Sequence, residues 1–110
     1  MDIKILMVYS TGSRAMREVK AYELGKSGAA VHRDEVNPGF WQVSDIATGS
    51  AVGENAQTKK LAIANFHEKY EEKLYEFRKT PRYAELKSIL DEKIEAERQY
   101  IASVEGDDDE

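Results

Sequence analysis

The apolar residues of this chain change their spacing near Thr58, and this change constrains the fold more than any other feature. Before Thr58 they alternate with polar residues or form short runs broken by glycine, proline and asparagine, as in strands joined by turns. After Thr58 they recur every three or four residues, which is the spacing of one side of an α-helix. The sequence therefore predicts an α+β fold, with an N-terminal antiparallel β-sheet of about four to five short strands followed by two C-terminal α-helices.

Several segments of the first half have the composition of strands, and polar turns that contain glycine or proline separate them. The segments are residues 3–9, 15–24, 29–35, 40–47 and a brief one at 51–52. The second segment alternates poorly, which leaves a short helix open as an alternative. The first segment carries apolar residues on both sides, so we expect it to be central in the sheet.

Two helices are expected to follow, with a break at Thr80. The first runs from about Thr58 to Lys79, and its apolar stripe consists of Ile63, Phe66, Tyr70, Leu74 and Phe77. Thr80 and Pro81 have the residue types of an N-cap and a first helical position, so they should start a second helix. The stripe of that helix consists of Leu86, Leu90, Ile94, Ile101 and Val104, and Gly106 should end it. So short a connection predicts an antiparallel helical hairpin or a sharply kinked arm.

Length and charge predict one domain with an acidic tail. Residues 1–104 are expected to form a single domain, because a chain of 110 residues has the size of one. The formal net charge is −5, and residues 105–110 contain five carboxylates, so these residues are predicted to be a disordered acidic tail. A mimic of nucleic-acid phosphates is the alternative interpretation of the tail.

The cysteine content and the hydropathy of the sequence predict the cellular localisation of the protein. The chain has no cysteine, which suits a reducing compartment. It also lacks an apolar run of the ~20 residues that span a bilayer. We therefore expect a cytoplasmic protein without membrane contact.

Two lysines at the start of the first predicted helix are candidates for anion or nucleic-acid binding. Cations at a helix start oppose the helix dipole, so another interaction should compensate Lys59 and Lys60. A phosphate would do so, held by the free amides of the helix start after the glycine-containing hairpin at Gly49 and Gly53. The alternative is that both lysines are simply exposed to solvent.

A second group of cations follows the first turn. Arg14, Arg17 and Lys20 lie in the second predicted strand and together are a candidate anion site at the sheet edge. Cations on an edge strand also prevent aggregation, which is the alternative explanation.

The residue types that carry catalysis or bind metals do not form a motif in this sequence. His32 and His67 have no neighbour at ligand spacing, so no metal site and no cofactor are predicted. No nucleophile elbow is present, and the many helical carboxylates alternate with lysine and arginine as on a solvated helix face. The chain is therefore predicted not to be an enzyme.

The apolar stripe of the second helix exceeds what one face of a small sheet covers. Its members Leu86, Leu90, Ile94 and Ile101 are therefore predicted to bind a partner. The partner is either a second copy, which would make the protein a homodimer or a higher oligomer, or a target macromolecule.

Two resemblances rest on residues 40–66. The paired strands around Thr48-Gly49, followed by Thr58-Lys59-Lys60, resemble the C-terminal half of a double-stranded-RNA-binding domain. That resemblance implies that Lys59 and Lys60 contact phosphates, whereas Ile63 occupies the third basic position of the family. The Trp-x-Val, Thr-Gly and Thr-Lys-Lys run is also similar to small accessory and anti-defence proteins of bacteriophages.

These observations predict a non-enzymatic binding or inhibitor protein, encoded by a phage or mobile element and acting on a host defence or regulatory macromolecule in the host cytoplasm. One alternative is a nucleic-acid-binding module that uses Lys59 and Lys60. A further alternative is a protein that sequesters a small anionic, nucleotide-like signal between this helix start and the arginines near Arg14.

Overall fold

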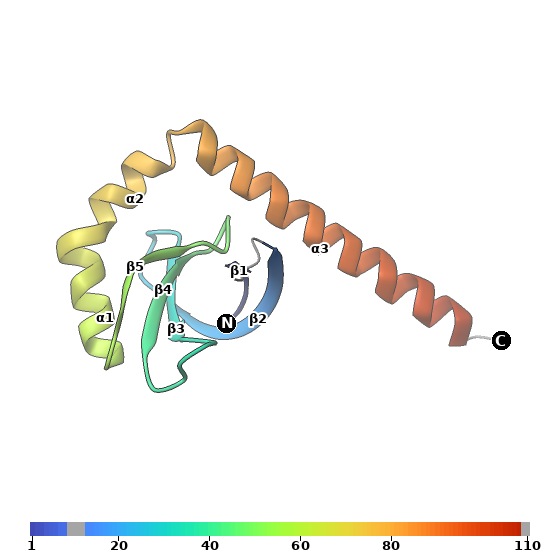
Figure 1. Cartoon of the computed structure of the whole chain (residues 1–110), viewed down its shortest axis with the longest axis horizontal. Coiled ribbons are helices and arrows are strands. Elements are labelled where there is room, and N and C mark those ends of the chain that lie inside the picture. Colours follow the sequence, from blue (N-terminus) through green and yellow to red (C-terminus); the bar gives the residue numbers. More distant parts are fainter. Residues whose placement is uncertain (9–12, 109–110) are drawn as a thin grey trace.

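A computed structural model describes residues 1–8 and 13–108 of the chain. Five strands come first, namely β1 (Asp2–Val8), β2 (Arg14–Glu23), β3 (Ala29–Arg33), β4 (Trp41–Asp45) and β5 (Ala51–Ala56). The helical half consists of α1 (Lys59–Asn65), a π-helical turn η1 (Phe66–Tyr70), α2 (Glu71–Phe77) and α3 (Pro81–Asp108). Figure 1 shows α1 to α2 as one curved layer beside the sheet and α3 as a long separate helix. The predicted α+β fold is confirmed.

The sheet is an antiparallel meander in which strands that are adjacent in sequence are also neighbours in space. Its order is β1-β2-β3-β4-β5, and β2 is a strand, so the alternative of a helix there is wrong. The prediction that the first strand is central is also wrong, because β1 lies at one end of this order. Tyr9, the last residue of that predicted strand, lies outside the described residues.

The first strand is nevertheless covered on both sides, because the sheet curls. On one face of β1, the curl places Ile3 and Ile5 in an apolar cluster with Val19, Ala21 and Ala30. The free edge of β1 meets the turn that follows β4, where the Leu6 amide donates a hydrogen bond to the Gly49 carbonyl at 2.8 Å. From the other side α3 reaches β1, and Lys4 Nζ lies 3.1 Å from a carboxylate oxygen of Glu97. Apolar residues on both sides of a strand therefore reflect the curl and the long helix, not a central position.

Two apolar clusters meet at β3, whose two faces are both covered. One cluster lies under the curved helical layer and consists of Leu24, Ala29, Val31, Val43, Ala56, Ala62, Phe66 and Leu74. The other lies inside the curl and consists of Ile3, Ile5, Val19, Ala21 and Ala30. The stripe predicted for the first helix is what packs on the sheet, and Phe66 is its most deeply buried member. Burial of large apolar side chains of this kind is the main stabilising term for a domain of this size.

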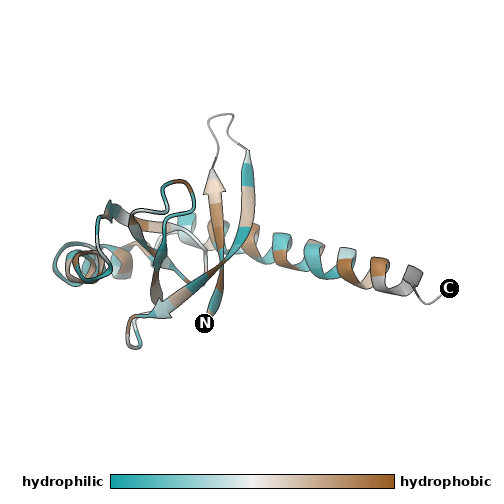
Figure 2. Ribbon diagram, turned by 90° about the horizontal axis from the view of Figure 1, so that it is seen from below, coloured by the Kyte–Doolittle hydropathy of each residue, from teal (hydrophilic) through white to brown (hydrophobic). Residues whose placement is uncertain are grey.

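The helical half bends sharply at residues 78–80. Thr80 Oγ1 accepts a hydrogen bond from the Tyr83 amide at 3.3 Å, so the predicted N-cap and the start at Pro81 are confirmed. Figures 1 and 2 show that α3 turns away from α2, passes the sheet and extends beyond it, which makes it a kinked arm and not a hairpin. The helical backbone continues to Asp108, so the prediction that Gly106 ends it is wrong. Among the described residues, no helix is long and apolar enough to cross a membrane.

Candidate functional site

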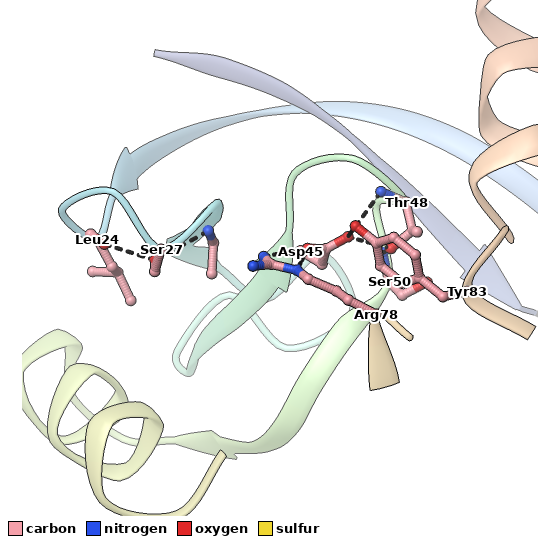
Figure 3. A network of polar contacts seen from close by, with 8 residues as sticks. Leu24, Ser27, Asp45, Thr48, Ser50, Arg78 and Tyr83 are labelled. Carbon is pink, nitrogen blue, oxygen red and sulfur yellow. Dashed lines mark hydrogen bonds and ion pairs between the residues drawn. The ribbon is translucent and has the colours of Figure 1, made fainter. Parts of the chain in front are cut away.

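The direction of the arm is fixed at its base by a buried carboxylate. Asp45, the last residue of β4, is only 1% exposed, and a charge so deeply buried needs several polar partners. Arg78, just after α2, donates to its Oδ1 from Nη2 at 2.8 Å and from Nε at 3.3 Å. The Tyr83 hydroxyl, in the first turn of α3, donates to Oδ2 at 3.0 Å. One carboxylate therefore joins the sheet to both sides of the helical bend (Figure 3).

The same carboxylate also shapes the turn after β4. Thr48 donates to Asp45 Oδ2 from its amide at 3.0 Å and from its hydroxyl at 2.8 Å. Those bonds hold the turn in which Gly49 meets β1. Because the turn, the strand and the helical bend all bond to one carboxylate, a substitution of Asp45 should destabilise all three together.

Tyr83 and Lys4, which contact the base and the middle of the arm, both have raised pKa values. Partial burial, and then the hydrogen bond to Asp45, raise the pKa of the Tyr83 hydroxyl above its ordinary value of 10.0. Hydrogen bonds to Glu18 and then Glu97 raise the pKa of the Lys4 ammonium above 10.5. Both shifts favour the protonated group in the folded protein, so their contribution to stability is present below the unfolded pKa and is lost as the pH rises through the folded value.

Replacing Tyr83 by phenylalanine is expected to lower the free energy of unfolding by about 1–2 kcal/mol at pH 7, because a hydrogen bond to a charged acceptor is lost. It should also reduce the loss of stability above pH ~10, where the Tyr83 hydroxyl begins to ionise in the unfolded wild-type chain. Urea unfolding followed by circular dichroism at neutral and alkaline pH measures both effects. Tyr100→Phe is the control, since the Tyr100 side chain is exposed. A variant whose stability and alkaline loss both equal those of the wild type would contradict the assigned bond.

The stripe of α3 divides into a covered and an uncovered part. Among the predicted partner-binding residues, Leu90 is 2% exposed and packs within its own chain, while Leu86 and Ile94 are half-buried. Ile101 is 46% exposed, and its neighbours Tyr100 and Val104 are 70% and 42% exposed. The available surface is therefore the distal patch, which we define as Tyr100, Ile101 and Val104. Tyr100 was missed as a site residue, although it lies one position from Ile101 and four from Val104.

In the first predicted cation site, Lys59 contacts aromatic rings of its own chain. Lys59 Nζ lies 3.4 Å from the centre of the Tyr22 ring and 6.0 Å from that of Trp41. A cation over an aromatic face is attracted by the ring, and Thr58 caps the helix by accepting from the Leu61 amide at 3.1 Å. The two rings therefore stabilise the Lys59 ammonium group at the helix start, and no bound anion is needed to offset the unfavourable helix dipole. Lys60 is exposed.

The side chains of the second group of cations do not point toward a common site. In the pairing of β1 with β2, Arg14 lies opposite Val8, Arg17 opposite Ile5 and Lys20 opposite Asp2. Because side chains alternate along a strand, Arg17 projects from one face of β2 while Arg14 and Lys20 project from the other. Lys20 is two positions from Tyr22, whereas Arg14 is eight positions away, roughly 26 Å along an extended strand. Lys59 and Arg14 consequently do not line one site within this chain.

A buried histidine and serine have the geometry of a base beside a hydroxyl. His32 Nδ1 lies 2.7 Å from the Arg33 carbonyl, which only accepts, so this nitrogen donates. Nε2 then accepts from the Ser44 hydroxyl at 2.8 Å. Both residues are 2% exposed, and His32 contributes to the wall of a cavity of about 360 Å³ whose lining does not include Ser44. The pair therefore satisfies buried polar groups between β3 and β4.

Comparison with protein families, curated proteins and solved structures finds no match to this chain. The resemblances to a double-stranded-RNA-binding domain and to bacteriophage proteins stay predictions. Among the described residues, no group of three or more histidine or acidic side chains is placed to hold a metal ion.

Proposed function

We propose that this protein is a non-enzymatic binding or inhibitor protein of a phage or mobile element, which docks the distal patch of α3 on a host defence or regulatory protein. The observation that carries the proposal is the exposure of Tyr100, Ile101 and Val104 on the same side of α3 that buries Leu90. Large apolar side chains gathered on a projecting element are typical of interaction surfaces. The suggested origin rests on the sequence resemblance alone.

The arm suits recognition of a groove by a preformed helix. Ile101 and Val104 are three positions apart and Tyr100 and Val104 four, which are the spacings that place anchors on one helix face. The base of α3 is held by Asp45 and its middle by the Lys4–Glu97 ion pair. A helix that is already ordered loses less conformational entropy when it binds than a flexible segment does.

The chemistry of the partner follows from the charges that come after the patch in the sequence. Five carboxylates follow Val104 in the sequence, within residues 105–110. A partner with an apolar groove and basic side chains on its rim would be complementary to this end of the arm. Three side chains cover far less than the roughly 800 Å² per partner of a standard interface, so a concave partner that encloses them is favoured over a flat one.

Binding is tested with two variants that each place three glutamines on the arm. The variant Y100Q/I101Q/V104Q changes the distal patch, and A96Q/A102Q/S103Q changes exposed positions of the same helix outside it. Each protein is immobilised and exposed to lysate of a bacterial host, and retained proteins, nucleic acids and nucleotides are identified. We expect one protein to be retained by the wild type and by the control variant and lost with the patch variant, with a purified-component Kd that rises at least about tenfold.

Other outcomes of this experiment would reject the proposal. Retention of nucleic acid or nucleotide without a protein would favour the alternatives built on Lys59 and Lys60. Light scattering that shows a dimer in the wild type and a monomer in the patch variant would instead assign the patch to a second copy of this chain.

A further inference from the structure

An apolar groove lies beneath the helical bend, between the first part of β5 and the two helices. Its volume is about 490 Å³, which is within the range of small-molecule sites in proteins. Its apolar walls come from Val52 of β5, from Tyr70, Leu74 and Phe77 of the curved helical layer, and from Leu86 of α3. The groove is separate from the distal patch, which lies at the other end of α3.

One end of the groove is built by a close approach of an aromatic ring to the backbone. Gly53 has a φ of +76°, and a Cβ atom at this position would lie 2.4 Å from the Tyr70 ring. Because Gly53 has no side chain, the ring lies directly on the strand and forms an end wall. Lys73 is exposed, and its Nζ lies 5.8 Å from the centre of that ring, so the ammonium group lies at the same end of the groove.

The lining of the groove carries a positive charge. Among the residues that the structure describes, Lys73 is the only charged one that lines the groove, and no carboxylate lines it. Of the other described lining residues, Ser50 and Tyr70 have hydroxyl groups that can donate a hydrogen bond. An apolar site with a single cation at one end is complementary to a molecule with an apolar body and one anionic group.

We infer that this groove binds a small amphipathic monocarboxylate, with its apolar chain against Val52, Phe77 and Leu86 and its carboxylate at Lys73. This site goes beyond the proposed function, because it needs no protein partner. Phe77 and Leu86 lie on opposite sides of the bend at residues 78–80. A ligand that contacts both would therefore also favour the present orientation of the arm.

The probe is sodium octanoate below its critical micelle concentration, titrated into the full chain and followed by backbone-amide NMR. We expect saturable binding of one equivalent, with the shifts concentrated at residues 50–53 and 70–77. Lys73→Glu should weaken octanoate binding at least about fivefold, because it removes an exposed charge pair and introduces a repulsion. The same change should strengthen binding of octylammonium, which carries the opposite charge on the same chain.

Lys69→Glu is the matched control, since Lys69 is an exposed lysine one turn away that does not line the groove. It should change octanoate binding by less than about twofold. Equal weakening by both substitutions would mean that overall charge attracts the anion, and would overturn the assignment. Absence of saturation, or shifts confined to residues 100–104, would overturn it as well.

Discussion

Replacing Gly49 by alanine is expected to lower the free energy of unfolding by about 2–5 kcal/mol, which is a large part of the stability of a domain of this size. Gly49 has a φ of +69°, and a Cβ atom there would lie 2.7 Å from the Lys4 carbonyl oxygen and 2.9 Å from the Leu6 nitrogen. Those atoms belong to the backbone of β1, which cannot move without opening the curl of the sheet. Urea unfolding followed by circular dichroism measures the loss.

The variant Gly25→Ala separates the cost of the steric contact from the cost of placing alanine at a positive φ. Gly25 also has a positive φ, of +60°, but nothing lies within 4 Å of the position of its missing Cβ. Its substitution should therefore cost only the conformational term of about 1–2 kcal/mol. If the two variants were equally destabilised, the contact between β1 and the turn would not contribute as the structure indicates. Hydrogen exchange at the Leu6 amide, which bonds to Gly49, should accelerate in Gly49→Ala alone.

Replacing Asp45 by alanine is expected to lower the free energy of unfolding by about 3–5 kcal/mol, because the Arg78 guanidinium loses its anionic partner in a partly buried position. The Thr48 and Tyr83 donors lose their acceptor at the same time. Thermal and urea unfolding would report the loss. Asp91→Ala is the control, since Asp91 forms an exposed ion pair with Lys87 at 3.1 Å and should change stability by less than about 1 kcal/mol.

A double variant identifies the source of that loss. If the unpaired guanidinium dominates, Asp45→Ala/Arg78→Met should be more stable than the sum of the two single changes predicts. Strict additivity would mean that Asp45 and Arg78 act independently, contrary to the 2.8 Å contact between them.

The parts of the fold that could be predicted are those with local causes. The spacing of apolar residues after Thr58 defined the stripe that packs on the sheet, and Thr80 with Pro81 marked the bend, because caps act within one helical turn. The place of β1 could not be predicted, since the curl that covers it depends on a contact with Gly49, far along the chain. An alternating pattern of apolar residues indicates that one face of a strand is buried, but it does not indicate which other element buries that face.

The candidate site was predicted only in part for the same reason. The stripe of α3 was evident, but the division between buried Leu90 and exposed Ile101 depends on where the sheet ends beneath the helix. Asp45 gave no signal in the sequence, because its partners Arg78 and Tyr83 are 33 and 38 residues away. The unusual position of Lys59 was noticed, whereas its compensation by the Tyr22 ring required the folded chain.

The meander order of the sheet also has a consequence for how the chain folds. Each strand pairs with the strand that precedes it, so the sheet forms through short loops that close at little entropic cost. The contact between Lys4 and Glu97 instead spans 93 positions and requires the last helix. The sheet can therefore form before α3 is in place, and the docking of α3 on β1 is expected to follow the formation of the sheet.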